Sequence, residues 1–238
     1  MFHYIENKEF LKAMRRECAD TVNRLKQAIN AEDFLKVEVH LVGSGARGLE
    51  TRNENEPVDL DYNLCIKTIH GNINDARRIK EYVKGKFNAV LKSKGWKDCS
   101  DSTSALTTKK VSVPGFKTKF SIDLAIVREE NDAWYRLIHK KTGDVKKDSW
   151  IWNQGPNSKG LNQKVRWIKE NNHTPELRTA YLKKKNAYLS SQDDNHSSFI
   201  CYIEAVNEVY DAYHNPNGSK KNKISKNKEK TINAKLFL

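Results

Sequence analysis

Hydrophobic spacing in the first hundred residues predicts helices that alternate with strands. Apolar residues recur every three or four positions over 6–31 and again over 74–95, which is the period of an amphipathic helix. The segment 37–42 instead alternates, carries β-branched side chains and is followed by glycine, so it predicts a strand. A second strand is expected over about 58–67.

The middle of the chain predicts two hairpins. The segments "SALTTKKVSVPG" and "FKTKFSIDLAIVRE" have the pattern of two strands joined by a turn at Pro114 and Gly115, and Pro-Gly is a strong turn signal. The segment "WYRLIHKKTGDVKKDSWIWN" predicts a second hairpin, which turns at Thr142, Gly143 and Asp144.

The remainder of the chain predicts helices and a basic tail. Helices are expected over 159–171, 175–190 and 195–213, and the lysine-rich end has the composition of a mobile segment. The expected fold class is α+β, with a small helical portion packed on the sheet. The expected domain bounds are 1–155 for the core with its N-terminal helix, 156–214 for the helical portion and 215–238 for the tail.

The charge balance narrows the class of partner. The chain of 238 residues holds 43 Lys and Arg against 30 Asp and Glu, a formal net charge of +13. A positive surface raises the rate of encounter with polyanions such as nucleotides and nucleic acid. Because many soluble proteins are basic, charge alone favours such a partner only slightly.

The sequence lacks the features of disulfide-linked, zinc-binding, secreted and membrane-spanning proteins. The four cysteines show no CxxC or CxxH spacing, which argues against a disulfide framework or a structural zinc site. The N-terminus lacks the features of a signal peptide. No apolar run approaches the roughly 20 residues that span a bilayer. A cytoplasmic protein without a membrane partner is therefore expected.

Two aspartates open the second predicted strand, in "VDLDYNLCI". Residues two apart in a strand point to the same face, so Asp59 and Asp61 lie together, opposite Leu60 and Tyr62. Two carboxylates at this spacing cannot both be buried without a cation, and Mg²⁺ prefers carboxylate oxygens. Asp-x-Asp is common by chance, however, and the alternative is a pair of solvated carboxylates at a strand end.

A third carboxylate changes this balance. Asp123 stands in an apolar strand, with Phe120, Ile122 and Leu124 on the opposite face. Aspartate is depleted from strands and is rarely buried unless it is paired. If this strand lies beside the first, three carboxylates converge. That arrangement can hold two divalent ions about 3.5–4 Å apart for an in-line displacement at phosphorus.

A glycine-rich turn precedes the aspartates, at Gly43 and Ser44. Such a turn offers backbone N–H groups and a hydroxyl to phosphate oxygens. Gly45 and Gly48 would permit close approach of the backbone, and Arg47 would add a charge-assisted contact. A Gly-Ser turn alone is weak evidence, but its conjunction with Asp-x-Asp and a lone strand aspartate is specific.

This conjunction resembles the DNA-polymerase-β-like nucleotidyltransferase superfamily, whose signature appears here as Gly43-Ser44, Asp59-Leu60-Asp61 and Asp123. Within it, the N-terminal helix, the "GSGARG" turn and the later helices look most like the oligoadenylate-synthase-like and bacterial cyclic-oligonucleotide synthase (CD-NTase) branch. The resemblance implies a mixed sheet flanked by helices.

The resemblance also implies roles for these residues. Asp59 and Asp61 would bind both of two Mg²⁺ or Mn²⁺ ions, and Asp123 would bind one of them beside the attacking hydroxyl. Ser44 and the neighbouring backbone, including Gly43, would hold the β- and γ-phosphates of a nucleoside triphosphate.

The predicted helical portion offers further candidates for nucleotide binding. Lys169 or Lys164 could reach a phosphate, although the many lysines make any single one a weak candidate. Ser197 or Ser198 is either the N-cap of the last predicted helix, which we favour, or, by resemblance, a triphosphate contact.

The function implied is metal-dependent transfer of a nucleoside monophosphate from a nucleoside triphosphate, ATP by default, to a hydroxyl, with release of pyrophosphate. The acceptor is a nucleotide, an RNA end, a protein or a small molecule such as an antibiotic, and a cyclic oligonucleotide signal is one product. The alternatives are a non-catalytic nucleotide- or RNA-binding module on the same fold and a basic RNA-binding scaffold. The acidic loop at 52–57 and the oligomeric state have no explanation from the sequence.

Overall fold

A computed structural model describes three stretches of the chain. The predicted basic tail, 215–238, lies outside the described residues. The described residues are 1–155, 160–191 and 197–214.

The chain divides into two compact units. The larger one comprises Ile5–Pro156, and the smaller one combines Met1–Tyr4 with Asn157–Leu238. Each unit is described by itself.

The larger unit is built on a mixed sheet, which confirms the predicted fold class. Its main strands lie in the order β10-β9-β8-β4-β2. Strands β4 and β8 run parallel, whereas the other neighbouring pairs along this path are antiparallel. These strands are β2 (Leu35–Leu41), β4 (Val58–Ile69), β8 (Lys119–Glu130), β9 (Ala133–Lys140) and β10 (Ser149–Gln154).

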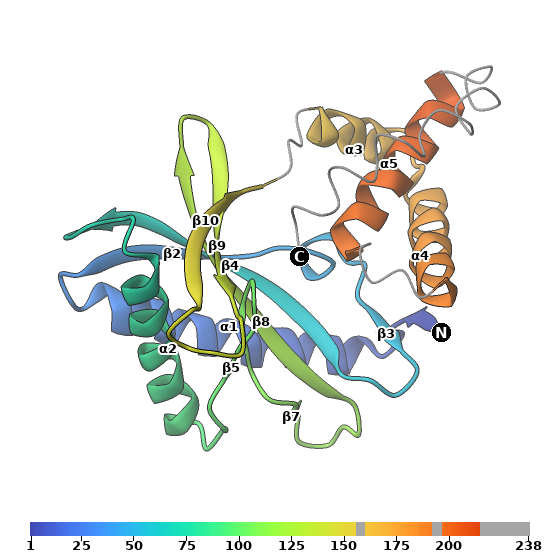
Figure 1. Cartoon of the computed structure of the whole chain (residues 1–238). Helices are drawn as coiled ribbons and strands as arrows, with labels where there is room; N and C mark the ends of the chain where they lie inside the picture. The colour runs from blue at the N-terminus through green and yellow to red at the C-terminus, as the bar shows by residue number, and fades with distance from the viewer. Residues whose placement is uncertain (156–159, 192–196, 215–238) are drawn as a thin grey trace. The chain divides into compact units, whose positions relative to one another are not determined.

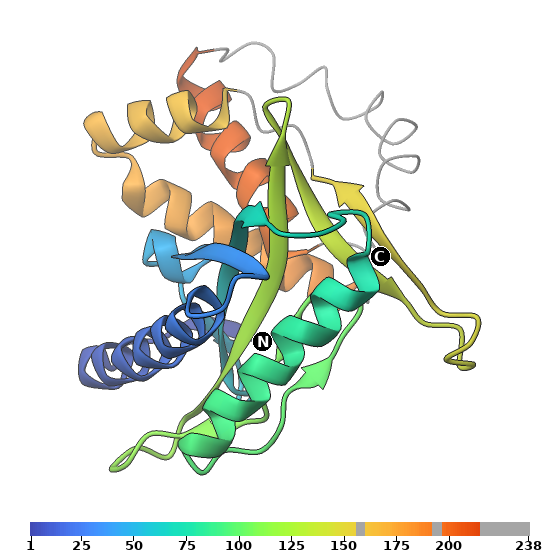
Figure 2. The same cartoon turned by 90° about the vertical axis from the view of Figure 1, so that its left-hand side faces the viewer.

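Two helices of the larger unit, α1 (Lys8–Asn30) and α2 (Ala76–Ser93), pack on one face of this sheet (Figures 1 and 2). The apolar sides of both helices are buried against one face of β4 and β8. The side chain of Asn7 accepts a hydrogen bond from the Phe10 N–H at the start of α1, and that of Asp75 accepts one from the Arg78 N–H at the start of α2. Such N-caps satisfy backbone donors that a helix leaves unpaired.

Short elements complete the unit. A 3-10 turn, η1 (Gly45–Arg47), and a short strand, β3 (Thr51–Asn53), lie between β2 and β4. Three more strands precede β8, and two of them pair with it directly. They are β5 (Ser100–Asp101), β6 (Leu106–Thr107) and β7 (Val111–Ser112).

The prediction of one continuous strand before the Pro-Gly turn is wrong, because this segment is broken into β6 and β7. The break is at Thr108. Its N–H donates to the Ile122 carbonyl, and its hydroxyl accepts a 2.9 Å hydrogen bond from the Ile122 N–H. A side chain therefore replaces one backbone acceptor, and the regular ladder is interrupted there.

The smaller unit holds three helices at about the predicted positions, together with the short strand β1 (Phe2–Tyr4). The Phe2 N–H donates to Asn186 Oδ1 at 2.7 Å, and the Tyr4 hydroxyl donates to the Arg178 carbonyl at 2.7 Å. These hydrogen bonds hold β1 against the second of the three helices in this unit. The helices are α3 (Leu161–Glu170), α4 (Thr174–Ser190) and α5 (Ser198–His214).

Within the described stretches, every helix is too short or too polar to cross a lipid bilayer.

Candidate active site

The register between β4 and β8 brings the predicted carboxylates together. Asp61 pairs with Asp123, and Asp59 pairs with Ser121. Paired residues of neighbouring strands point to the same face, as do residues two apart in one strand. All three aspartates therefore lie on one face, whereas Leu60 and the residues that alternate with the aspartates are buried in the core beneath α1 and α2.

The environment of Asp123 disfavours its negative charge. Burial raises the pKa of this carboxyl, and repulsion from Asp59 raises it further. A hydrogen bond of 2.6 Å from the Thr107 hydroxyl and the charge of Arg136 only partly oppose these effects. The positive charge near this carboxylate does not fully offset the cost of its negative charge. An added cation would therefore bind favourably.

Asp59 and Asp61 have different neighbours. Asp59 is exposed, and the Ser121 hydroxyl donates a hydrogen bond to its Oδ1. Arg136, on β9, is close enough to Asp61 and Asp123 that both carboxylates raise its pKa. Burial of the guanidinium outweighs them and lowers that pKa, although the residue as a whole keeps a large exposed surface.

The Gly-Ser turn lies directly against Asp61. The Val42 N–H donates to the Asp61 carbonyl at 2.8 Å. Gly43 has a φ of +62°, and a Cβ placed there would overlap the Asp61 carboxylate, at only 3.0 Å from its Cγ. Glycine is therefore required by the backbone angle and by the close approach together.

A second set of contacts braces this turn. Arg15, on α1, forms an ion pair with the buried Glu50 and donates from Nη2 to the Gly45 carbonyl at 3.3 Å. Arg47 donates from Nη1 to the Gly43 carbonyl at 2.6 Å. The predicted phosphate contact of Arg47 would thus involve a side chain that also holds the turn.

Gly45 packs closely against the hydrophobic core because it has no side chain. A Cβ at this position would lie 2.6 Å from Leu60 Cδ2 and 3.1 Å from Leu41 Cδ1, so the turn fits against the core only without one. Around Gly48, by contrast, there is open space.

The remaining predicted residues, Lys169 and Ser198, belong to the smaller unit. Lys169 lies exposed in the last turn of α3. Ser198 is the first residue of α5, and the hydroxyl that accepts from the Ile200 N–H, at 3.4 Å, is that of Ser197. Their role in nucleotide binding stays a prediction.

Four residues near the aspartates and the turn were not predicted from the sequence. Ser121 was within reach, because strand alternation places it on the same face as Asp123. Thr107 and Arg136 come from other strands, and Arg15 comes from α1. Nothing in their local sequence distinguishes these three from other polar residues.

The donor chemistry of this face fits a divalent cation. Carboxylate oxygens are the ligands that Mg²⁺ prefers, and Asn63 Oδ1, two residues from Asp61, is buried without a hydrogen-bond partner among the described residues. The described part of the chain nevertheless contains no group of three or more His, Cys, Asp or Glu side chains arranged as a metal site.

No model of a protein family and no curated protein matches the sequence. Solved structures do match. Escherichia coli MS115-1 CdnC with ATP is 16% identical, with a TM-score of 0.51 over 87% of this chain and 66% of that one. The CdnC:HORMA-deltaN complex is 14% identical, with a TM-score of 0.52 over 87% and 61%. Escherichia coli DncV bound to 3′-deoxy GTP is 14% identical, with a TM-score of 0.53 over 86% and 68%.

At these identities the likeness concerns the fold. The chain shares the fold of CdnC and DncV, which confirms the fold that the motif resemblance implied. The chain spans only about two thirds of the length of the solved chains that it matches.

Proposed function

We propose that the chain is a divalent-metal-dependent nucleotidyltransferase that uses a nucleoside triphosphate. The observation that carries this proposal is the pairing of Asp61 with Asp123, which gathers three carboxylates on one face beside the Gly43-Ser44 turn. The fold shared with CdnC and DncV supports it, because those proteins were solved with ATP and 3′-deoxy GTP.

In this proposal Asp59 and Asp61 would be ligands of both ions, and Asp123 would be a ligand of one. The metal would supply charge neutralisation at the phosphates and would lower the pKa of the attacking hydroxyl. Ser44 and the turn backbone hold the β- and γ-phosphates, and Lys169 and Ser198 are further candidate contacts. Gly43 keeps the turn close enough to Asp61 for both groups to reach one triphosphate.

The reaction joins an acceptor hydroxyl oxygen to the α-phosphorus and breaks the bond from that phosphorus to the oxygen that bridges to the β-phosphate. Pyrophosphate leaves, and the hydroxyl proton passes to Asp123 or to water. Arg136 lies near Asp61 and Asp123, where its charge offsets part of the negative charge of the carboxylates.

We favour a nucleotide as acceptor, with a linear or cyclic oligonucleotide as product. The net charge of +13 supports a polyanionic substrate. An RNA end, a protein or a small molecule remains a competing acceptor.

The test is product analysis by mass spectrometry after incubation with all four nucleoside triphosphates and Mg²⁺ or Mn²⁺. The parent should release pyrophosphate and form a new phosphodiester, whereas Asp59→Ala with Asp61→Ala should form none. A matched control, Asp33→Ala with Asp98→Ala, removes the same charge at exposed positions and should keep the activity. Nucleotide binding without turnover by the parent, across a panel of acceptors, would instead identify a non-catalytic module.

A further inference from the structure

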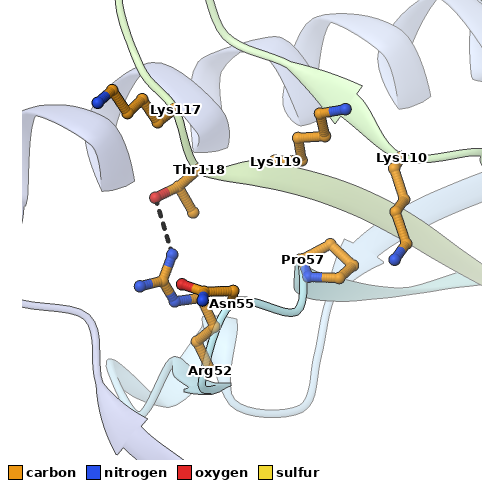
Figure 3. Close-up of a pocket in the computed structure, with 7 residues that line it drawn as sticks. All are labelled: Arg52, Asn55, Pro57, Lys110, Lys117, Thr118 and Lys119. Atoms are coloured by element: carbon orange, nitrogen blue, oxygen red, sulfur yellow. Dashed lines mark hydrogen bonds between the residues drawn. The ribbon is translucent and has the colours of Figure 1, made fainter.

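A cavity of about 520 Å³ lies where β4 and β8 begin (Figure 3). One wall comes from β3 and the acidic loop that the sequence left unexplained. The other wall comes from Lys110, just before β7, and from the segment at the start of β8. The lining residues are Arg52, Asn55, Pro57, Lys110, Lys117, Thr118 and Lys119.

The lining is strongly cationic. It includes one arginine and three lysines and no carboxylate. The neighbouring Glu56 pairs with Lys110 at 3.2 Å, but both side chains are more than half exposed, and such surface pairs contribute little. A concave site lined by one sign of charge concentrates counter-ions of the opposite sign.

Arg52 lines this cavity and keeps one side-chain donor unpaired. Its Nη1 donates to the Thr118 hydroxyl at 3.0 Å (Figure 3). Its Nε is buried and has no hydrogen-bond partner among the described residues. A buried donor without a partner costs free energy, and guanidinium N–H groups match phosphate oxygens in a two-point contact.

The loop that carries Asn55 is shaped to form this wall. Glu54 adopts a φ of +47°, which is uncommon for a residue other than glycine. The Glu56 N–H donates to the Asn53 carbonyl at 2.9 Å, which closes a turn. The two glutamates of this segment are exposed and are absent from the cavity lining, whereas its asparagine and proline belong to it.

We propose that this cavity binds a chain of phosphate groups without the help of a metal ion. Its volume is that of a small-molecule site, and four cations spread over it fit several linked phosphates better than a single anion. No aromatic side chain lines it, so it lacks the stacking contacts by which single-stranded nucleic acid is held. It would therefore recognise the phosphates and ignore the base.

The cavity is separate from the residues assigned to catalysis but close to them. Pro57 and Lys119 stand two residues before Asp59 and Ser121 on their strands, a step of about 7 Å. The phosphate chain of a small molecule held there would lie next to the carboxylate face. This inference goes beyond the proposed transfer reaction and does not depend on it.

The test is calorimetric titration of the full chain with sodium tripolyphosphate in EDTA at low salt. We expect saturable binding that Lys117→Gln with Lys119→Gln weakens about tenfold or more, and that Arg52→Gln also weakens. The control Lys12→Gln with Lys97→Gln removes the same charge from exposed positions and should change the affinity less than twofold. An equal loss in both double variants would mean diffuse surface charge and would overturn the proposal.

Further titrations distinguish between the possible ligands of this cavity. ATP and GTP should bind like tripolyphosphate in EDTA, and adenosine should not bind. The Asp59→Ala, Asp61→Ala variant should bind at least as tightly as the parent, so failure of the catalytic proposal leaves this result untouched. Tripolyphosphate binding that is abolished in that variant, or single-stranded RNA binding through these lysines without tripolyphosphate binding, would overturn the assignment.

Discussion

Two of the partly buried charge groups in the larger unit contrast in how their carboxylates are paired. On the carboxylate face, burial and the charge of Asp59 disfavour the Asp123 carboxylate, and Arg136 offsets this only in part. The second group, which we call the His139 network, comprises Lys80, Asp101, His139 and Asp148, and in it each carboxylate has a nitrogen partner on another element.

The His139 network is closed on itself. Lys80 is 2% exposed and contacts Asp101 Oδ1 at 2.7 Å. His139 meets Asp101 through Nδ1 at 3.1 Å and Asp148 through Nε2 at 2.9 Å, while its ring stacks on Trp150 at 4.2 Å. The network joins α2, β5, β9 and the turn of the second hairpin.

The difference between the two groups teaches how to separate structural from functional charges. A buried group in which every carboxylate has a nitrogen partner requires no further ligand and stabilises the fold. A group with excess charge of one sign is costly unless a further ion or substrate joins it, and such groups cluster at functional sites. This criterion predicts a structural role for the His139 network and supports the functional role that we propose for the aspartate face.

The largest expected effect is that of Asp123→Asn. Turnover should fall about 10²–10⁴-fold, because this substitution removes the carboxylate that we propose as metal ligand and acceptor of the hydroxyl proton. Thermal stability should stay the same or rise, since a charge that the fold disfavours is removed. Pyrophosphate release and a melting curve measure both quantities. A variant that loses activity because it unfolds would place Asp123 with the structural group.

The second prediction concerns Lys80→Met. Removal of the ammonium leaves Asp101 without its closest cation, and breaking a buried pair costs about 3–5 kcal/mol. The control Lys67→Met breaks an exposed pair with Glu38, at 3.5 Å, and should cost less than about 1 kcal/mol. Urea unfolding measures the difference. Equal stability of the two variants would show that the His139 network is not structural.

The third prediction compares two glycines that share a left-handed backbone. Gly43 and Gly48 have φ values of +62° and +67°, so Ala at either position costs roughly 1 kcal/mol of backbone strain. Gly43→Ala alone pushes against Asp61 and should lower turnover about 10²-fold, because small misplacements of reacting groups are that costly. Gly48→Ala should keep turnover within about threefold in a steady-state assay.

The smallest expected effect concerns the pH dependence of stability. The charge of Asp101 should stabilise the fold, whereas the charge of Asp123 should destabilise it. Burial raises the pKa of Asp101, but Lys80 and His139 outweigh it and hold that pKa below its usual value. Charged Asp101 is therefore stabilising above about pH 4 and loses this contribution as the pH falls further. The pKa of Asp123 is raised, so its charge is destabilising at neutral pH and the penalty disappears on acidification.

Asp101→Asn should accordingly be less stable than the parent at pH 7, and Asp123→Asn more stable, each by on the order of 1 kcal/mol. Both differences should shrink as the pH falls to about 3. Urea unfolding in EDTA between pH 7 and pH 3 tests this. Differences of the same sign would refute the contrast between the two groups.

The sequence by itself determined the elements and the identity of the three carboxylates. Hydrophobic period distinguished α1 and α2 from the strands, and alternation separated Asp59 and Asp61 from the buried Leu60. These are local properties, because they depend on the geometry of one helix or one strand. The motif that links the Gly43-Ser44 turn to the aspartates was sufficient to predict the fold class.

Only the tertiary structure decided which residues meet. Strand order and register set Asp61 opposite Asp123, closed the His139 network and placed the acidic loop at a cationic cavity. Each of these depends on pairing between distant segments, and a slip of one residue in register would turn every side chain to the other face. The sequence alone therefore named the carboxylates, whereas the register of the sheet decided that they lie on one face.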